Sequence, residues 1–176
     1  MVMLVESGAA PQRPDPALSD AEIEAILDAM EEASPGKAEY LDGVFTMSRP
    51  QVVHQRTLVA LLLAFNRSLA PELEALPDIQ VVTAGAWIIP DLVVARRTRY
   101  DDNPKRLAPA DVVLMIEITS PSTVRRDREA KQAFCAEHGI DYWIVDPGEP
   151  WGAIEAHALG EGLVAVPDPV PGDRIP

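Results

Sequence analysis

Cysteine is almost absent from this chain: Cys135 is the single one among 176 residues. One thiol excludes an intrachain disulfide framework and a zinc site built on Cys-x-x-Cys pairs, and it suits a reducing compartment. Long apolar runs are missing too, because the longest candidate, TLVALLLAF at 57–65, is half of the roughly 18 residues that a membrane span needs. The N-terminus also lacks the basic segment of a secretory signal. We therefore expect a cytoplasmic protein that does not enter the membrane.

Positive charge is scarce as well, since 15 Lys and Arg stand against 28 Asp and Glu, a net charge of −13. Such a balance argues against a nucleic-acid partner, because phosphates are bound by basic surfaces. The distribution is uneven, however: residues 91–131 hold nine Lys/Arg and seven Asp/Glu, a net charge of +2. A nucleic acid would meet this central third, although solvated loop charges would give the same count. Neither G-x-G-x-x-G nor G-x-x-x-x-G-K-[ST] occurs, so a nucleotide-phosphate loop has no support.

Apolar periodicity predicts a single α/β (α+β) domain over residues 19–170, behind a proline-containing leader at 1–18 that we expect to be disordered. The domain should contain a mixed β-sheet flanked by helices. Apolar spacing and capping residues indicate the helices, and β-branched runs bounded by Gly, Pro or Asp indicate the strands. The expected elements are a helix from Ser19 or Asp20 to Pro35-Gly36, a hairpin at Asp42-Gly43, a helix over 51–70 buried on most sides, strands in IQVVTAG, AWIIPDLVVA, DVVLMIEIT and IDYWIVDP, a helix from Ser122 or Thr123 to Gly139, and a terminal hairpin of WGAIEAHAL with LVAV.

Two carboxylates interrupt hydrophobic strands in this pattern: Asp91 follows Pro90 between AWII and LVVA, and Glu117 lies inside VVLMIEI. Removing water from an ionised carboxylate is costly unless a cation compensates. If the two strands pair, the carboxylates converge, and without a cation between them they raise one another's pKa. Oxygen ligands with retained waters suit Mg²⁺ or Mn²⁺. Taken alone, Asp91 could belong to a turn beside proline, and Glu117 could pair with a buried arginine.

Several segments together carry a resemblance to a known family. PDLVVA is followed by a basic loop and then by EITSPST, DREAK and GIDYWIVDP, with EYLDG and a histidine-containing helix start upstream. In this order they resemble the bacterial restriction-endonuclease domain of the PD-(D/E)XK superfamily, the Uma family, over about residues 20–150. The resemblance implies a restriction-endonuclease-like core with an αβββαβ order, which agrees with the elements expected from periodicity.

The resemblance also implies roles for the acids. Asp91 and Glu117 match the two acids of the family motif and, with the backbone carbonyl of Ile118, would hold Mg²⁺ or Mn²⁺. The metal would polarise the scissile phosphate and lower the pKa of an attacking water. Glu39 matches an additional acid near the first strand and would be a further catalytic residue.

The lysine of the motif is displaced in this sequence. Thr119 stands where the superfamily has lysine, and the matching lysine of this family is Lys131 on the following helix. Lys131 would place the attacking water or stabilise charge on a phosphorane-like transition state. An ion pair with Asp127, four residues earlier on the same helix, is equally compatible with the spacing.

Contacts to nucleic acid would come from His54 and from basic residues of the central third. His54 could contact a phosphate or act as a base, although packing at the start of its helix is favoured by the pattern. Loops such as RRTRYDDNPKRLAPA would carry any sequence preference. The candidate nucleic-acid-binding residues are Arg97, Arg99, Arg125, Arg126, Arg128 and His54.

The sequence thus predicts a Mg²⁺-dependent endonuclease that hydrolyses nucleic-acid phosphodiester bonds, with DNA as the substrate. The strongly acidic composition and Thr119 keep a second hypothesis open, a catalytically degenerate nuclease fold that serves as a binding or regulatory module. In a third, the acidic surface mimics nucleic acid and binds a basic partner. A homodimer is compatible with the family resemblance, but no feature of the sequence fixes it.

Overall fold

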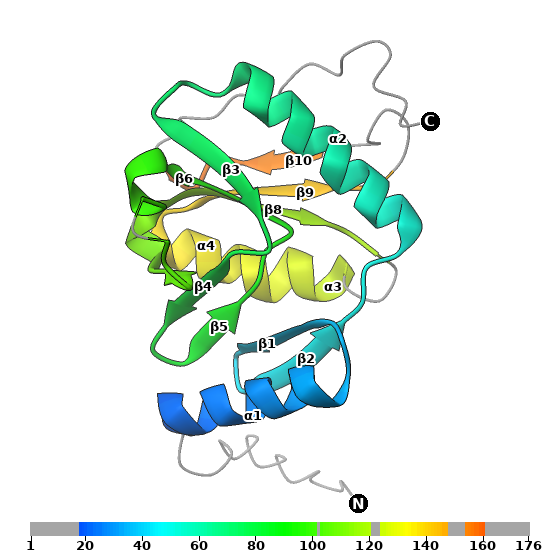
Figure 1. Cartoon of the computed structure of the whole chain (residues 1–176), viewed down its shortest axis with the longest axis vertical. Helices are drawn as coiled ribbons and strands as arrows, with labels where there is room; N and C mark the ends of the chain where they lie inside the picture. The colour runs from blue at the N-terminus through cyan, green and yellow to red at the C-terminus, as the bar shows by residue number, and fades with distance from the viewer. Residues whose placement is uncertain (1–17, 102, 121–123, 148–153, 161–176) are drawn as a thin grey trace, which may run out of the picture.

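The computed structural model describes residues 18–101, 103–120, 124–147 and 154–160, which form two five-stranded mixed sheets flanked by helices (Figure 1). The predicted α+β class is confirmed, but the strands divide between two sheets instead of one. The first sheet has the order β2 (Val44–Ser48), β1 (Lys37–Leu41), β5 (Ala86–Ile88), β4 (Gln80–Thr83), β7 (Arg106–Leu107). The second has the order β10 (Ile154–His157), β9 (Asp141–Val145), β8 (Val112–Ile118), β6 (Leu92–Arg96), β3 (Leu73–Pro77).

Three long helical segments cover these sheets. They are α1 (Asp20–Ala33), α2 (Val52–Ser68) and a composite helix that runs from α3 (Val124–Arg126) through the π-helical turn η3 (Asp127–Lys131) into α4 (Gln132–His138). Two 3₁₀ turns, η1 (Arg97–Arg99) and η2 (Pro109–Asp111), lie in the basic loop. None of the helices in the described part of the chain combines the length and the apolar character of a membrane span.

The N-terminal elements are those that the sequence predicted. Ser19 caps α1 with a capping box: its hydroxyl accepts from the Glu22 amide at 3.4 Å, and the Glu22 carboxylate accepts from the Ser19 amide at 2.9 Å. Asp42 and Gly43 both have positive φ, 53° and 79°, as a tight two-residue hairpin turn requires, and they join β1 to β2. At the other end of the chain, Gly139 closes the composite helix in the left-handed conformation, with φ 66°.

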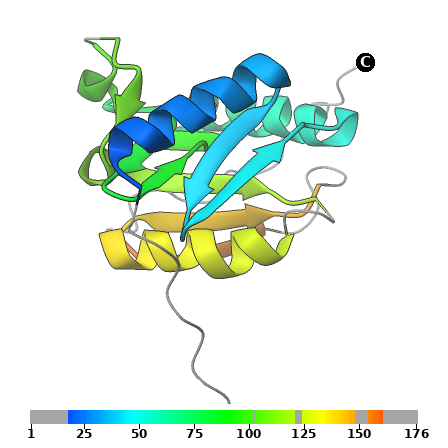
Figure 2. The same cartoon turned by 90° about the horizontal axis from the view of Figure 1, so that it is seen from below.

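Apolar side chains join the layers in three clusters. One packs α2 against one face of the second sheet, through residues such as Leu61, Phe65 and Ile116. The opposite face of the second sheet packs against both α4 and the first sheet, and α1 covers the far face of the first sheet. Figure 2 shows α1 and the composite helix on opposite sides of the strands between them. The space between the two sheets is therefore an interior layer of the domain.

The segment AWIIPDLVVA, predicted as strand, is not one continuous strand. Its first part, β5, belongs to the first sheet and its last part, β6, to the second. Pro90 lies between them and has no N–H to offer to a ladder, so strand pairing is interrupted there. The chain crosses from one sheet to the other at this point, and Asp91 stands at the crossing. β6 then pairs antiparallel with β8, with Leu92 opposite Ile116, so the two acid-bearing strands are neighbours.

The prediction that the second helix is buried on most sides is wrong. α2 buries Leu58, Leu61 and Phe65 against the second sheet, whereas Val59 and Leu63 are each 42% exposed. A helix in an outer layer contacts its sheet along one face, and the number of apolar residues alone does not reveal that. The edge strand β3 was not predicted at all, because LEALP contains Glu, Ala and Pro, which are depleted in strands; a proline is tolerated at an edge.

Some predicted features lie outside the described residues. They include most of the leader, the cap candidates Ser122 and Thr123, and the LVAV half of the terminal hairpin at 163–166. The other half of that hairpin is β10, which pairs antiparallel with β9.

Candidate active site between the two sheets

Side-chain alternation along β8 directs Glu117 into the layer between the sheets. Successive side chains of a strand point to opposite faces. Ile116 and Ile118 pack under α2, whereas Met115 faces the first sheet and α4. Glu117 is two residues from Met115 and therefore faces the same interior layer, where it is 4% exposed.

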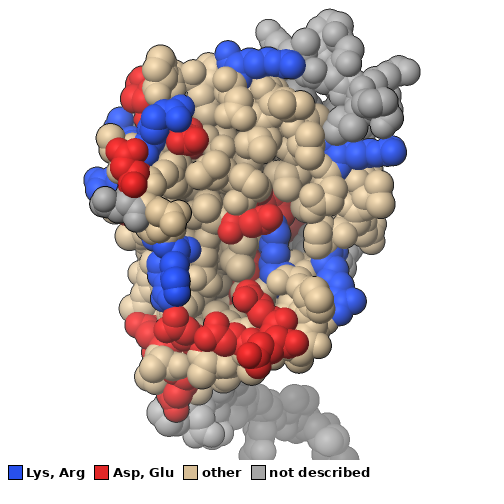
Figure 3. Space-filling view, in the orientation of Figure 1, with Lys and Arg blue, Asp and Glu red and all other residues tan. Residues whose placement is uncertain are grey.

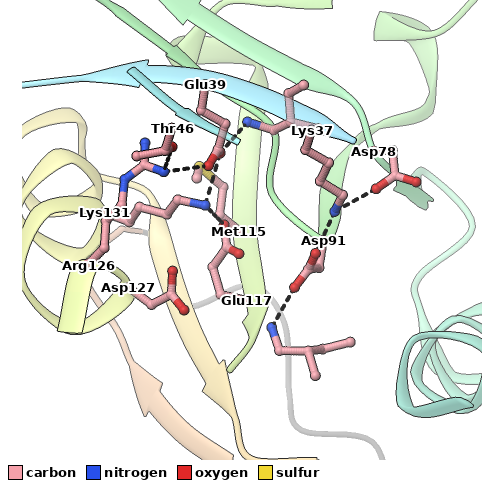
Figure 4. A network of polar contacts seen from close by, with 12 residues as sticks. Lys37, Glu39, Thr46, Asp78, Asp91, Met115, Glu117, Arg126, Asp127 and Lys131 are labelled. Carbon is pink, nitrogen blue, oxygen red and sulfur yellow. Dashed lines mark hydrogen bonds and ion pairs between the residues drawn. The ribbon is translucent and has the colours of Figure 1, made fainter. Parts of the chain in front are cut away.

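The same alternation brings in residues from the other strands. Asp91 precedes β6 and shares the side of Val93, which packs in the interior cluster. In β1, Leu41 packs in that cluster too, so Glu39 and Lys37 lie on the same face of the strand. Charged groups from β1, β6 and β8 thus meet at one end of the interior layer, as Figure 4 shows.

These side chains line a pocket of about 330 Å³. Of the residues that the sequence predicted for the site, Glu39, His54, Asp91, Glu117, Ile118, Arg126 and Lys131 line it. Lys37 and Asp127 line it as well and were not predicted as site residues. Lys37 is two residues before Glu39 in the same strand, and that spacing was the signal that could have identified it.

Glu117 is held by Lys131. The Lys131 ammonium lies 2.7 Å from Glu117 Oε1 and 2.9 Å from Glu39 Oε1, and it is almost completely buried. Burial raises the pKa of Glu117 well above its usual range, against the opposing charge of Lys131 and with the further help of Asp91. Burial lowers the pKa of Lys131, but the two carboxylates raise it more, so the charged form of Lys131 is favoured.

Glu39 has three donors around its carboxylate. Oε1 accepts from the Ile89 amide at 2.7 Å in addition to Lys131, and Oε2 accepts from Arg126 at 2.8 Å. Arg126 also donates to the hydroxyl of Thr46 on β2. Burial raises the pKa of Glu39, but the charges of Lys131 and Arg126 lower it more. Glu39 therefore links the first sheet to the helix that carries Lys131.

Asp91 is held from the other side of the pocket. Lys37 lies 2.5 Å from its Oδ1, while the Ile118 amide and His54 Nε2 each lie 2.8 Å from its Oδ2. Burial raises the pKa of Asp91, but the hydrogen bond from His54 and the charge of Lys37 lower it well below its usual range. The pattern favoured packing for His54; the structure instead brings its ring to the first acid. His54 Nδ1 is buried and has no hydrogen-bond partner in the described part of the chain.

We expect Asp91 to contribute to the acid sensitivity of the fold. Its folded pKa lies below its unfolded value of about 3.9, so its stabilising contribution is present above that pH and is lost as pH falls. In EDTA, wild-type unfolding free energy should therefore decline below about pH 4, and Asp91→Asn should decline less steeply. Urea denaturation between pH 2 and 6, with exposed Asp20→Asn as control, measures this; equal slopes below about pH 4 would contradict it.

Most of the predicted nucleic-acid-binding arginines do not line the pocket. Arg97 pairs with Glu74 at 3.1 Å, Arg99 with Asp111 at 3.0 Å and Arg125 with Glu129 at 3.9 Å, and Arg128 pairs with Glu155. Arg126 is the member of this set that reaches the pocket. Sequence clustering could not separate them, because neighbouring residues on a helix point in different directions.

Two local features accompany the displacement of the lysine from position 119 to the helix. The π-helical turn η3 carries both Asp127 and Lys131 with buried side chains; such turns are rare and are frequent at functional sites. Thr119, at the position where the superfamily has lysine, is buried with its hydroxyl 3.3 Å from the Val145 carbonyl oxygen. The Thr119 hydroxyl is thus hydrogen-bonded to the backbone of β9.

The residues present fit a divalent metal ion of the magnesium type. Asp91, Glu117 and the Ile118 carbonyl offer oxygen atoms of the kind that would hold such an ion, and waters commonly complete its shell. A cation beside Glu117 would offset the cost of burying its charge and would lower its raised pKa. The described residues contain no group of three or more His, Cys, Asp or Glu side chains arranged as a metal cage.

Comparisons with known proteins agree with this fold. The chain is similar to a crystal structure described as "a putative nuclease belonging to DUF820" from Anabaena variabilis, with a TM-score of 0.55 and 22% sequence identity over 80% of this chain and 88% of that one. That likeness shows that the two chains share a fold. The family model Uma2, described as "Putative restriction endonuclease", matches residues 23–172, and the chain belongs to this family. A search of curated proteins finds no significant match.

Proposed function

We propose that this protein is a metal-dependent endonuclease that hydrolyses phosphodiester bonds in DNA. The observation that carries the proposal is that Asp91, Glu117 and Lys131, from two neighbouring strands and the following helix, line one pocket. Membership of a restriction-endonuclease family supports the reaction class. On the face seen in Figure 3, a band of acidic side chains lies at the bottom of the view, over α1, which carries Asp20, Glu22, Glu24, Asp28, Glu31 and Glu32.

In the proposed site, Asp91, Glu117 and the Ile118 carbonyl would hold Mg²⁺ or Mn²⁺, and the ion would polarise the phosphate and make a water molecule more acidic. The oxygen of the attacking water forms a bond to phosphorus as the bond to one ester oxygen breaks. The water gives up a proton to solvent, and the departing ester oxygen takes one up. Lys131 keeps its proton, so its contribution is to attract negative charge on the phosphate and to orient the water.

A cleavage assay tests the proposal. Plasmid and linear DNA, single-stranded DNA and RNA are incubated with the protein and Mg²⁺, Mn²⁺ or EDTA. We expect DNA cleavage with either metal and none with EDTA. Calorimetric titration with Mn²⁺ establishes whether the site is loaded under the same conditions. A protein that binds the metal and leaves every DNA intact would contradict the proposal.

A second function is favoured by one observation. Both acids already have cationic partners within the protein, Lys37 for Asp91 and Lys131 for Glu117, and the superfamily lysine position holds Thr119. A site compensated in this way is stable without metal, as in a nuclease fold that serves as a binding or regulatory module. That function predicts a folded protein that binds neither Mg²⁺ nor Mn²⁺.

A further inference from the structure

Lys37 is a charged group of the pocket to which the proposed reaction assigns no role. Its ammonium lies 2.5 Å from Asp91 Oδ1 and 2.6 Å from Asp78 Oδ1. Burial lowers the pKa of Lys37, but the charges of Asp91 and Glu117 raise it more, so it is a cation close to both acids of the site. In Figure 4, the two lysines reach the site from different directions, Lys131 from the left to Glu117 and Lys37 from above to Asp91.

Backbone pairing fixes the position from which the Lys37 side chain extends. Lys37 is the first residue of β1 and pairs with Ser48, the last residue of β2. Gly36 precedes it, and a Cβ on Gly36 would lie 2.6 Å from the Ser48 carbonyl oxygen, closer than atoms of this kind approach. Glycine therefore allows the start of β1 to lie tightly against β2, and the lysine side chain extends from that point across the pocket.

Lys37 is also the more accessible of the two pocket lysines. Its side chain is 14% exposed, against 4% for Lys131, whose ammonium is held between Glu39 and Glu117. Lys37 lines both the site pocket and an adjoining one of about 480 Å³, which Arg49 and the half-exposed Asp78 also line. Lys37 is therefore shared by the two pockets, whereas Lys131 lines the site pocket and not the adjoining one.

We propose that Lys37 is a substrate-binding residue whose ammonium contacts a non-bridging phosphate oxygen of a DNA strand held in the pocket, and that it thereby supplies the cation that position 119 lacks. The inference rests on the proposed function for the identity of the ligand. Lys37 would exchange its exposed partner Asp78 for the phosphate. An ammonium has three donors, so Lys37 can keep its contact with Asp91 while it donates to a phosphate oxygen. An ammonium acts on phosphate as a point charge and needs no paired geometry.

The test measures binding separately from cleavage. A short fluorescein-labelled DNA duplex is titrated with protein by fluorescence anisotropy in Ca²⁺, at several salt concentrations, and a gel verifies that the duplex stays intact. The variants are Lys37→Met, which removes the charge and keeps the stem, and Lys37→Arg, which keeps the charge. Arg67→Met is the matched control, because it removes one positive charge at an exposed position of α2 that lines neither pocket. If Lys37→Met does not fold, Lys37→Gln replaces it.

We expect Lys37→Met to bind the duplex about 10-fold or more weakly, and the slope of log affinity against log salt to fall by about 0.9, the value for one lost phosphate contact. Lys37→Arg should keep most of the affinity and the slope. Affinity for Mn²⁺ in Lys37→Met should stay equal or become tighter, because a cation that competes for Asp91 is gone. A residue that merely positions Asp91 would weaken Mn²⁺ binding and leave the salt slope unchanged, which would overturn the proposal.

These outcomes separate the inference from the nuclease function itself. Cleavage by the wild type in Mg²⁺ decides the nuclease function alone. Loss of affinity and slope in Lys37→Met supports the inference whether or not cleavage is seen. An unchanged Lys37→Met, or a wild type that does not bind the duplex, overturns the inference even if the protein cleaves DNA.

Discussion

A Glu117→Gln variant is expected to remain folded and to lose metal binding together with DNA cleavage, by at least about 10²-fold in kcat. Gln has nearly the same volume as Glu, and its side-chain oxygen can still accept from Lys131. Lys131 also keeps its second partner, Glu39, at 2.9 Å. The variant therefore removes one negative charge from the proposed metal site without leaving a buried lysine unpaired. Calorimetry with Mn²⁺ and a plasmid-cleavage time course measure the two losses.

Glu129→Gln is the control for this experiment. Glu129 lies on the composite helix, is 70% exposed and pairs with exposed Arg125 outside the pocket, so its loss should change neither metal binding nor cleavage. Cleavage by Glu117→Gln at the wild-type rate would overturn the assignment of Glu117 to the site of cleavage. Absence of metal binding in both wild type and variant, with a variant at least as stable as the wild type, would support the binding-module function instead.

Lys131→Met is expected to lower the free energy of unfolding by about 3–5 kcal/mol at neutral pH, the usual cost of breaking a buried pair by removing one partner. Its ammonium compensates Glu117 and Glu39 in a region with almost no exposure. Methionine fills much of the same space, so the loss reflects uncompensated charge more than a cavity. Urea denaturation monitored by circular dichroism measures the difference, and exposed Lys105→Met should differ little from the wild type.

The double variant Lys131→Met/Glu117→Gln identifies the cause of that loss. Removal of both charges should recover a large part of the stability, and the recovery is a coupling free energy. The penalty in Lys131→Met should also shrink as pH falls. Without Lys131 the pKa of buried Glu117 rises further, so this carboxyl takes up a proton more readily in the folded state than in the unfolded state. A penalty that is independent of pH and is not reduced in the double variant would mean that packing of the lysine stem, and not charge, dominates.

The elements with strong local signals were predictable from the sequence. The capping box at Ser19, the Asp42-Gly43 turn and the end of the composite helix at Gly139 depend on residues within a few positions of each other. The convergence of Asp91 and Glu117 was predictable for a different reason: both interrupt apolar strands, and a buried charge in such a place needs a partner.

Long-range arrangement was less predictable. Pro90 marks a break in AWIIPDLVVA, but it does not indicate that the two halves pair in different sheets, because their pairing partners lie far away in the chain. Lys37 does not interrupt an apolar run, because it is the first residue of its strand. Its place in the site depends on the contact with Asp91, 54 residues later in the chain. The direction of each arginine in the central third is set by helix and loop geometry, which a charge count does not contain.

The position of the site at the junction of the two sheets has a mechanical consequence. Glu39 belongs to the first sheet, Glu117 to the second, and the Lys131 ammonium bridges them, while Asp91 stands where the chain passes from one sheet to the other. The same charges that would act on a phosphate thus also fasten the halves of the domain together. A descendant of this chain without nuclease activity would still be under selection to keep these charges, because they join the two sheets whether or not they act on a phosphate.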